Sequence, residues 1–380
     1  MKDRPTEKDF IRVFSRVFQL KNKPLLFGSE FDDCAVLKLA SLSQNLLAES
    51  LTFSTDTVRE STDFPKGMTL WQKGWMSAAV NLSDLAAMGS KPVAFLFSAG
   101  LPRSFTLEDA EEFARGIQEC VSFFGAEVIG GDTEYNEELS ITGTVIGILE
   151  NKNVIYRKNA KPGDFLCVTG HTGSAGVALS VLLNRIPESA SDAFLKNLTE
   201  PFPRIYEGMM LAKSGAVNSM IDTSDGLASS VYELSALSGV FFEIDEQKLP
   251  LEPEALEIVS TRLKRKTEMN ELNEDQTAQE ARLILIHESL YTGGDYELLF
   301  TIPPEKLSVI EEVFRKINEN AAAQLKTYSS AGKSGRYPCK FTVIGKAIAE
   351  KENVNIRQTT YEEQRLPLLK RGYNSFTKDI

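Results

Sequence analysis

The stretch that decides the fold is Asn81-Leu82-Ser83-Asp84-Leu85-Ala86-Ala87-Met88-Gly89. It ends an apolar run that starts near Thr69, in which apolar side chains recur every three or four residues: Trp71, Trp75, Ala78, Ala79, Leu82 and Ala86. This spacing is the period of an α-helix, and Gly89 is typical of the residue that follows a helix. The pattern predicts a helix whose last turns place Asn81 and Asp84 on one face.

Asp84 has two interpretations. The backbone dipole is negative near the C-terminal end of a helix, so a carboxylate there costs roughly 0.3–1 kcal/mol unless a cation offsets it. The nearest basic residue is Lys91, beyond one helical turn, so a bound metal ion is the functional interpretation. An exposed Asp, or a cap where the helix breaks at Ser83, is the structural alternative. This stretch alone leaves both open.

Length, composition and charge limit the class of protein. A chain of 380 residues, 42% hydrophobic and 25% charged, is typical of a globular protein with two domains. The formal net charge of −11 argues against a nucleic-acid binder that uses a basic patch. No apolar run approaches the roughly 20 residues of a membrane span, and no signal-peptide core follows the polar N-terminus. The four cysteines form no CxxC pair, so we expect reduced thiols and a cytoplasmic protein.

Strand-like and helix-like segments alternate along the chain, which favours an α/β or α+β fold. A polar turn at 150–153 suggests a boundary, with one domain at 1–150 and a second at 151–380. Within the second domain, residues 262–281 are polar and of mixed charge. We interpret them as a solvated loop or insertion with some helix.

Acidic residues recur at strand ends and tight turns, next to Gly, Ser or Thr: Asp33, Asp56, Asp132, Asp222, Asp225 and Asp295. Each alone has a structural explanation, because Asp favours turns and helix starts. Strand ends tend to meet at one sheet edge, where gathered carboxylates repel unless divalent cations neutralise them. Oxygen ligands in a chain with two histidines suit Mg²⁺ better than zinc. Mg²⁺ without an evident general base favours phosphoryl transfer.

A glycine-rich turn, Gly170–Gly176, lies between an expected strand and an expected helix. It lacks the Gly-Lys-Ser/Thr ending of a Walker A motif. Either it presents backbone N–H groups to a phosphate, or it is a packing turn. Arg157 could likewise hold a phosphate or lie on the surface.

Six motifs resemble, in the same order, those of the thiamine-monophosphate kinase family: Ser54–Thr57, Asn81–Gly89, Gly130–Thr133, Ala160–Asp164, Ile221–Leu227 and Asp295–Phe300. The resemblance extends from about residue 27 to the end of the chain. This family belongs to the aminoimidazole-ribotide synthetase superfamily. It uses ATP and Mg²⁺ to phosphorylate thiamine monophosphate to the diphosphate, so the resemblance implies these ligands and this activity.

The resemblance also implies a fold and a set of site residues. It implies a homodimer in which the N-terminal sheets pair into a shared barrel, while a C-terminal α/β domain covers the nucleotide. By motif match the Mg²⁺ ligands would be Asp33, Thr55, Asp56, Asp84, Asp132, Asp222 and Asp225. The ATP contacts would be Gly131, Arg157 and Ser224, and the substrate contacts would be Asp63, Asp295 and Tyr373.

Three positions depart from the pattern of the family. Phe31 stands where the family usually has Gly, Asp63 stands where it has a substrate-contacting His, and Gly294 stands where it has an acid. A non-catalytic or altered-substrate nucleotide-binding paralogue is therefore an alternative. A selenophosphate synthetase would need a reactive cysteine before Cys34, and the hydrogenase-maturation dehydratase would need a C-terminal cysteine, so both are disfavoured.

Overall fold

The structure of the chain is a computed structural model. It describes residues 26–27, 35–37, 50–149, 154–186, 190–267, 274–330, 338–349, 355–358 and 364–368. Asp33, Tyr373 and the polar turn at 150–153 lie outside this described part. No helix in the described ranges has the length and apolar character needed to cross a bilayer.

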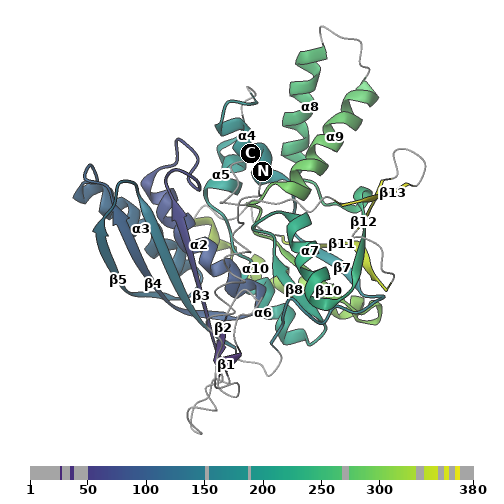
Figure 1. Cartoon of the computed structure of the whole chain (residues 1–380), viewed down its shortest axis with the longest axis horizontal. Helices are drawn as coiled ribbons and strands as arrows, with labels where there is room; N and C mark the ends of the chain where they lie inside the picture. Colours follow the sequence, from purple (N-terminus) through teal and green to yellow (C-terminus); the bar gives the residue numbers. More distant parts are fainter. Residues whose placement is uncertain are drawn as a thin grey trace, which may run out of the picture.

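The strands form two sheets. The first has the order β1-β2-β3-β6-β4-β5, with the bounds Leu26–Phe27, Ala35–Leu37, Ser50–Arg59, Ser140–Leu149, Lys91–Leu101 and Glu127–Tyr135. The second has the order β13-β12-β9-β11-β7-β10-β8, with the bounds Gln364–Pro367, Asn355–Gln358, Phe241–Asp245, Phe341–Ile348, Phe165–Thr169, Leu298–Ile302 and Ser219–Asp222. Helices pack against both, so the fold is of mixed α and β type as expected (Figure 1).

The helices are α2 to α10: Leu70–Ala87, Leu107–Phe123, Ser174–Leu182, Asp192–Thr199, Ile205–Ser214, Leu227–Ser238, Pro253–Thr267, Glu274–Tyr291 and Leu307–Ser330. Two short 3₁₀ turns, η2 and η3, span Glu246–Lys248 and Pro304–Lys306. The helix expected from the Asn81–Gly89 stretch is confirmed as α2. Thr69 begins it with a capping box, and Gly89, at a φ of 66°, follows its last turn.

Helix α2 lies between the two sheets. It packs on α3, β3, β4 and β6 of the first half, and on α6 and β8 of the second half. The contact with α6 is so close that a Cβ on Gly208 would lie 2.1 Å from the carbonyl oxygen of Ala86. One hydrophobic core therefore continues from Trp75 and Phe95 to Phe300 and Ile310. The division of the chain at residue 150 stays a prediction.

Asp132 does not lie at a strand end or in a tight turn but within β5, which pairs in parallel with β4. The 262–281 stretch, interpreted as a solvated loop or insertion with some helix, contains more helix than expected, because residues 262–267 belong to α8 and residues 274–281 to α9. These two helices form a hairpin that projects from the body of the molecule (Figure 1).

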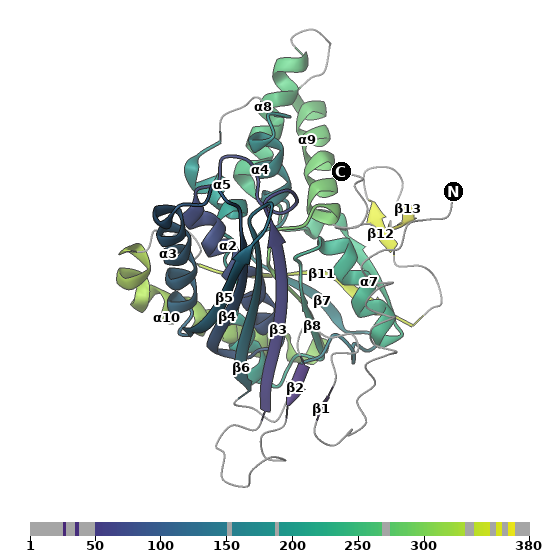
Figure 2. The same ribbon diagram turned by 60° about the vertical axis from the view of Figure 1, so that its left-hand side comes forward.

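The first sheet is open within the described part of the chain, so it closes no barrel on its own. Helices α2 and α3 cover one face, and the described elements leave the other face uncovered (Figure 2). The strand β5 forms one edge, and nearly all of its residues are exposed. Most neighbouring strands are antiparallel, and only the β4–β5 and β9–β12 pairs among the named strands are parallel. The acids therefore do not meet at the carboxyl edge of a parallel sheet.

Candidate active site at the junction of the two sheets

The C-terminal half of α2 turns two polar side chains toward β3. The side-chain oxygen of Asn81 accepts a hydrogen bond of 2.9 Å from the backbone N–H of Asp56, and the Asp84 carboxylate accepts one from the Ser54 hydroxyl. Residues 81 and 84 are three apart, so they share a helix face, and residues 54 and 56 share a strand face. The predicted common face of Asn81 and Asp84 is confirmed. Asp84 is half-buried and hydrogen-bonded, so it is not the freely exposed Asp of the structural alternative.

Ser83 points from α2 toward the second sheet. Its hydroxyl donates a hydrogen bond of 2.6 Å to Asp222, at the end of β8, and the Ser224 hydroxyl donates one of 3.0 Å to the other oxygen of the same carboxylate. Asp222 is 4% exposed. One turn of α2 thus contacts β3 of the first sheet through Asp84 and the end of β8 of the second sheet through Ser83.

Two loops of the second half are locked together beside Asp222. The N–H of Gly294 donates to the carbonyl of Ser224 at 2.9 Å, and the N–H of Thr223 donates to the carbonyl of Glu297 at 2.9 Å. A Cβ on Gly293 would lie 2.2 Å from the Ser224 oxygen, so only glycine fits there. This contact fixes the turn that carries Ser224 and Asp225 against the segment that leads into β10.

Tyr296, in that segment, packs against the main hydrophobic core. Burial raises the pKa of Tyr296 well above its usual value, and the negative charges of four carboxylates raise it further: Asp56, Asp222, Asp225 and Asp63. The convergence of Asp33, Asp56, Asp132, Asp222, Asp225 and Asp295 on one place stays a prediction. Sequence reasoning quoted the Asp295–Phe300 motif but assigned no role to its tyrosine.

Asp295 is bound to the start of α4. Its carboxylate accepts hydrogen bonds from the N–H of Gly173 at 2.7 Å, from the Ser174 hydroxyl at 2.8 Å and from the N–H of Ala175 at 3.0 Å. Burial raises the pKa of Asp295 to about 6, although these three hydrogen bonds act in the opposite direction. Of the two interpretations of the glycine-rich turn, packing is supported, because a carboxylate of the chain itself already occupies these N–H groups.

Glu297 forms a buried ion pair. Its carboxylate accepts hydrogen bonds from Arg204 Nε at 2.7 Å and Nη2 at 2.5 Å, and from the Thr169 hydroxyl at 2.6 Å. Arg204 also lies 3.7 Å from Glu207, a fully buried residue whose carboxylate pKa is raised by burial and lowered by this arginine. Asp295 and Glu297, the two acids that flank Tyr296 in the sequence, are thus both held in place by hydrogen bonds.

Other predicted site residues lie apart from this junction. The register aligns four residues in one row across β3, β6, β4 and β5: Asp56, Gly143, Phe97 and Gly131. Three strand spacings of about 4.8 Å put Gly131, and Asp132 after it, roughly 14 Å from β3. Thr55 points to the face opposite to Asp56, where its hydroxyl donates to the carbonyl of Gly143.

The remaining predicted residues occupy local turns. Asp63 accepts hydrogen bonds from the N–H of Arg59 at 2.8 Å and the Thr62 hydroxyl at 2.7 Å, in the turn after β3. Arg157 is half-buried, and its carbonyl accepts a hydrogen bond from Ser238. Asp33 and Tyr373 lie outside the described residues.

The donor chemistry of the junction suits a hard cation. Carboxylate and hydroxyl oxygens predominate, and oxygen is the ligand that Mg²⁺ prefers. Within the described ranges, no group of three or more Asp, Glu, His or Cys side chains is close enough to hold one ion. The residues fit Mg²⁺ by chemical type, and the predicted ligand Asp33 is not among those described.

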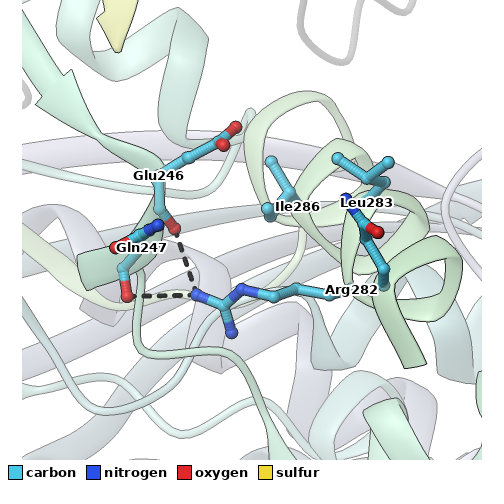
Figure 3. Close-up of a pocket in the computed structure, with 6 residues that line it drawn as sticks. Glu246, Gln247, Arg282, Leu283 and Ile286 are labelled. Carbon is cyan, nitrogen blue, oxygen red and sulfur yellow. Dashed lines mark hydrogen bonds between the residues drawn. The ribbon is translucent and has the colours of Figure 1, made fainter. Parts of the chain in front are cut away.

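A separate pocket of about 330 Å³ lies between η2 and α9 (Figure 3). Arg282 spans it and donates hydrogen bonds to the backbone carbonyls of Glu246, at 3.3 Å, and Gln247, at 3.0 Å. Leu283 and Ile286 form its apolar side. None of its lining residues is a predicted site residue, and its arginine is already hydrogen-bonded to the chain.

Comparison with known proteins defines the class of this fold and site. Residues 31–149 match the family described as AIR synthase related protein, N-terminal domain. This range contains β3, α2 and β5, and therefore every predicted site residue of the first half.

Two curated relatives narrow the class. The thiamine-monophosphate kinase of Methanospirillum hungatei is 40% identical over 276 residues, which are 73% of this chain and 81% of the relative. That of Pyrococcus horikoshii is 32% identical over 319 residues, 84% of each chain. A solved structure described as "AaThiL complexed with AMPPCP and TMP" is 25% identical and covers 99% of this chain and 100% of its own, with a TM-score of 0.70. The chain belongs to the thiamine-monophosphate kinase family.

Proposed function

We propose that this chain transfers the terminal phosphoryl group of ATP to thiamine monophosphate, giving thiamine diphosphate and ADP, with Mg²⁺ as the metal. The observation that carries the proposal is that one turn of α2 carries Asp84, bonded to Ser54 of β3, and Ser83, bonded to Asp222 at the end of β8. It occurs in a family whose curated members are named for this reaction, and a solved relative is described with an ATP analogue and TMP.

The residues of the chain would divide the work as follows. Ser54 and Ser83 orient Asp84 and Asp222 through their hydroxyl groups. The Mg²⁺ ligands would be Asp33, Thr55, Asp56, Asp84, Asp132, Asp222 and Asp225. Bound Mg²⁺ would neutralise the charge on the phosphates of ATP. Gly131, Arg157 and Ser224 would contact ATP, while Asp63, Asp295 and Tyr373 would contact thiamine monophosphate.

The proposal includes a homodimer in which the first sheets of two copies pair into a barrel. Three features support it. The sheet is open in the described part, its β5 edge is exposed, and one of its faces has no described cover. Asp132 also lies roughly 14 Å from β3 in the same copy, by the strand spacing. A second copy would give β5 new neighbours. Because ATP is the phosphate donor, we place the reaction in the cytoplasm.

We do not favour the non-catalytic paralogue. The two altered substrate-side positions have local structural explanations, because Asp63 closes a turn and Gly294 has a φ of 104°, where a side chain would be strained. Relatives named for the kinase are up to 40% identical over most of the chain.

The test is to incubate the purified chain with ATP, Mg²⁺ and thiamine monophosphate and to separate the products by chromatography. We expect thiamine diphosphate and ADP in equal amounts, and no product when EDTA is added in excess over Mg²⁺. Parallel reactions with thiamine, or with no acceptor, measure other phosphate transfers and ATP hydrolysis. Absence of thiamine diphosphate with intact ATP binding would overturn the assignment of the acceptor.

A further inference from the structure

Asn81 is a fully buried amide within an apolar stretch of helix. It lies on α2, its exposed fraction is 0%, and most of its neighbours along the helix are Ala, Val and Leu. Asn lowers the stability of a helix interior, because its side chain competes for backbone hydrogen bonds. A buried amide also costs free energy unless its own groups are hydrogen-bonded. Packing alone therefore does not account for an amide at this position.

Both ends of the Asn81 amide are hydrogen-bonded. The side-chain nitrogen donates to the carbonyl of Ser77, in the same helix, at 3.0 Å. The side-chain oxygen accepts from the backbone N–H of Asp56, on β3, at 2.9 Å. The opposite orientation of the amide would place donor against donor and acceptor against acceptor, so these two partners fix it. The amide therefore joins α2 to the strand backbone at Asp56.

The neighbouring strand β6 makes room for this amide. Gly143 is the ladder partner of Asp56, and a Cβ on Gly143 would lie 2.4 Å from the side-chain nitrogen of Asn81. A glycine inside a strand is typical of a place where another group approaches the backbone closely. The strand pair β3–β6 is therefore shaped to admit Asn81 beside Asp56.

A second hydrogen bond fastens the same stretch of β3 to α2. Asp84, three residues after Asn81 and on the same helix face, accepts from the hydroxyl of Ser54, two residues before Asp56. A strand held at two such positions cannot shift or rotate at Asp56 without breaking one of the two bonds. Because the side chain of a strand residue follows its backbone, these bonds set the direction of the Asp56 carboxylate.

We propose that Asn81 is a positioning residue of the phosphoryl-transfer site: its amide holds the β3 backbone at Asp56 and thereby directs the Asp56 carboxylate for Mg²⁺. The inference rests on the proposed function and adds to it a neutral residue that does not itself bind the metal. Mg²⁺ demands near-ideal octahedral geometry, so a small displacement of one carboxylate weakens its binding. An amide that only secures the packing of α2 would make a different prediction, because its loss would lower stability and leave the Mg²⁺ requirement unchanged.

The test is Asn81→Ser. The serine hydroxyl can still donate to the carbonyl four residues earlier in the helix, but it is too short to reach the N–H of Asp56. The Mg²⁺ concentration that gives half of the rise in melting temperature with AMPPCP should increase about ten- to hundredfold, the usual effect of losing a group that orients a metal ligand. In kinetic assays the Mg²⁺ requirement should rise by a similar factor, while the KM for thiamine monophosphate should change little.

The matched control is Thr52→Val. The Thr52 hydroxyl shares a buried hydrogen bond of 2.6 Å with that of Ser90, which follows α2, so it also links β3 to this helix. Valine keeps the shape of threonine and removes the bond. This variant should lose stability but keep the Mg²⁺ requirement of the unmodified chain. Equal Mg²⁺ requirements in folded Asn81→Ser and Thr52→Val would overturn the inference.

A second variant keeps the test decisive if Asn81→Ser does not fold. Asn81→Leu keeps the branched shape of the side chain and removes both hydrogen bonds, so the same increase in the Mg²⁺ requirement is expected. If the unmodified chain forms no thiamine diphosphate, the proposed function fails. A raised Mg²⁺ requirement for the AMPPCP-induced rise in melting temperature would still support the role of Asn81, because that readout needs no turnover.

Discussion

The junction of the two sheets and the outer edge strand β5 hold the same kinds of residue in opposite surroundings. At the junction, Asp222 is buried and accepts hydrogen bonds from Ser83 and Ser224. On β5, Gly131 and Asp132 are exposed, although the family resemblance assigns them to the same site as Asp222. The first group is fixed by contacts of the chain itself. We propose that the second group gains its surroundings from a ligand or from a second copy.

This difference separates the residues that pre-organise the site from those that complete it. Fixed donors and acceptors are effective in catalysis because they need no reorganisation during the reaction. The junction residues meet this condition before any ligand binds. Substitutions at the junction should therefore change stability or rate, whereas substitutions on β5 should change ligand binding alone.

Arg204→Ala should have the largest effect, on stability. It leaves Glu297 and Glu207 buried without their cation, and breaking a buried pair in this way costs about 3–5 kcal/mol. Urea unfolding measures the loss. The control at the edge is Arg103→Ala, which removes a cation placed 4.4 Å from the centre of the Tyr135 ring of β5. This loss should be about 0.5–1 kcal/mol. Equal losses at the two places would contradict the comparison.

Asp222→Asn should have the largest effect on rate. It removes the charge of a carboxylate that we propose binds Mg²⁺, so kcat/KM should fall about a hundredfold or more, at least the effect of losing an outer partner of a metal site. The side-chain oxygen that remains can still accept a hydrogen bond from Ser83, so the melting temperature should change little. Asp245→Asn, which alters the carboxylate that caps η2 at the end of β9, is the matched control and should keep full activity. A normal rate in Asp222→Asn would remove this residue from the site.

Asp132→Asn should have a smaller effect, on binding. An exposed residue on an edge strand contributes little packing, so the fold should stay intact while the affinity for AMPPCP with Mg²⁺ falls about tenfold. Isothermal calorimetry measures this affinity, and circular dichroism checks the fold. Glu127→Gln, at the start of the same strand, should bind normally. Unfolding of Asp132→Asn would show instead that the residue is structural.

Asp295 should produce a small dependence of stability on pH. Its pKa is raised from 3.8 to about 6 in the folded chain, so the folded state binds this proton more tightly than the unfolded state does. Its contribution to stability should therefore be greatest below about pH 4, decline as the pH rises to about 6, and stay constant above that.

The unfolding free energy of the unmodified chain, compared with Asp295→Asn at pH 4.5, 5.5 and 7, isolates this contribution. The free energy of unfolding of the unmodified chain, relative to that of Asp295→Asn, should fall as the pH rises. If the relative stability of the unmodified chain rises with pH instead, the hydrogen bonds from Gly173, Ser174 and Ala175 outweigh the effect of burial on the Asp295 carboxylate.

Local signals in the sequence predicted the elements that local interactions decide. The apolar spacing and the flanking Thr69 and Gly89 predicted α2. The contacts that decide this helix lie within a few residues along the chain.

Non-local contacts decided the features that were missed. Gly130–Thr133 has the composition of a turn, but pairing with β4 makes it a strand. The α8–α9 hairpin has a polar sequence, and its helices are anchored by contacts such as that of Leu285 in the core beneath it. The positive φ of Tyr296, 52°, occurs in a segment whose neighbouring side chains bond to residues more than ninety positions away, so no pattern around the tyrosine indicates it.

The most direct test of the account is a crystal structure of the chain with Mg²⁺ and AMPPCP. The account predicts metal ions bound to carboxylates of both halves, including Asp56 and Asp222, at the roughly 2.1 Å typical of Mg²⁺–oxygen contacts. Metal and phosphates bound at another place, with these carboxylates facing solvent, would contradict it.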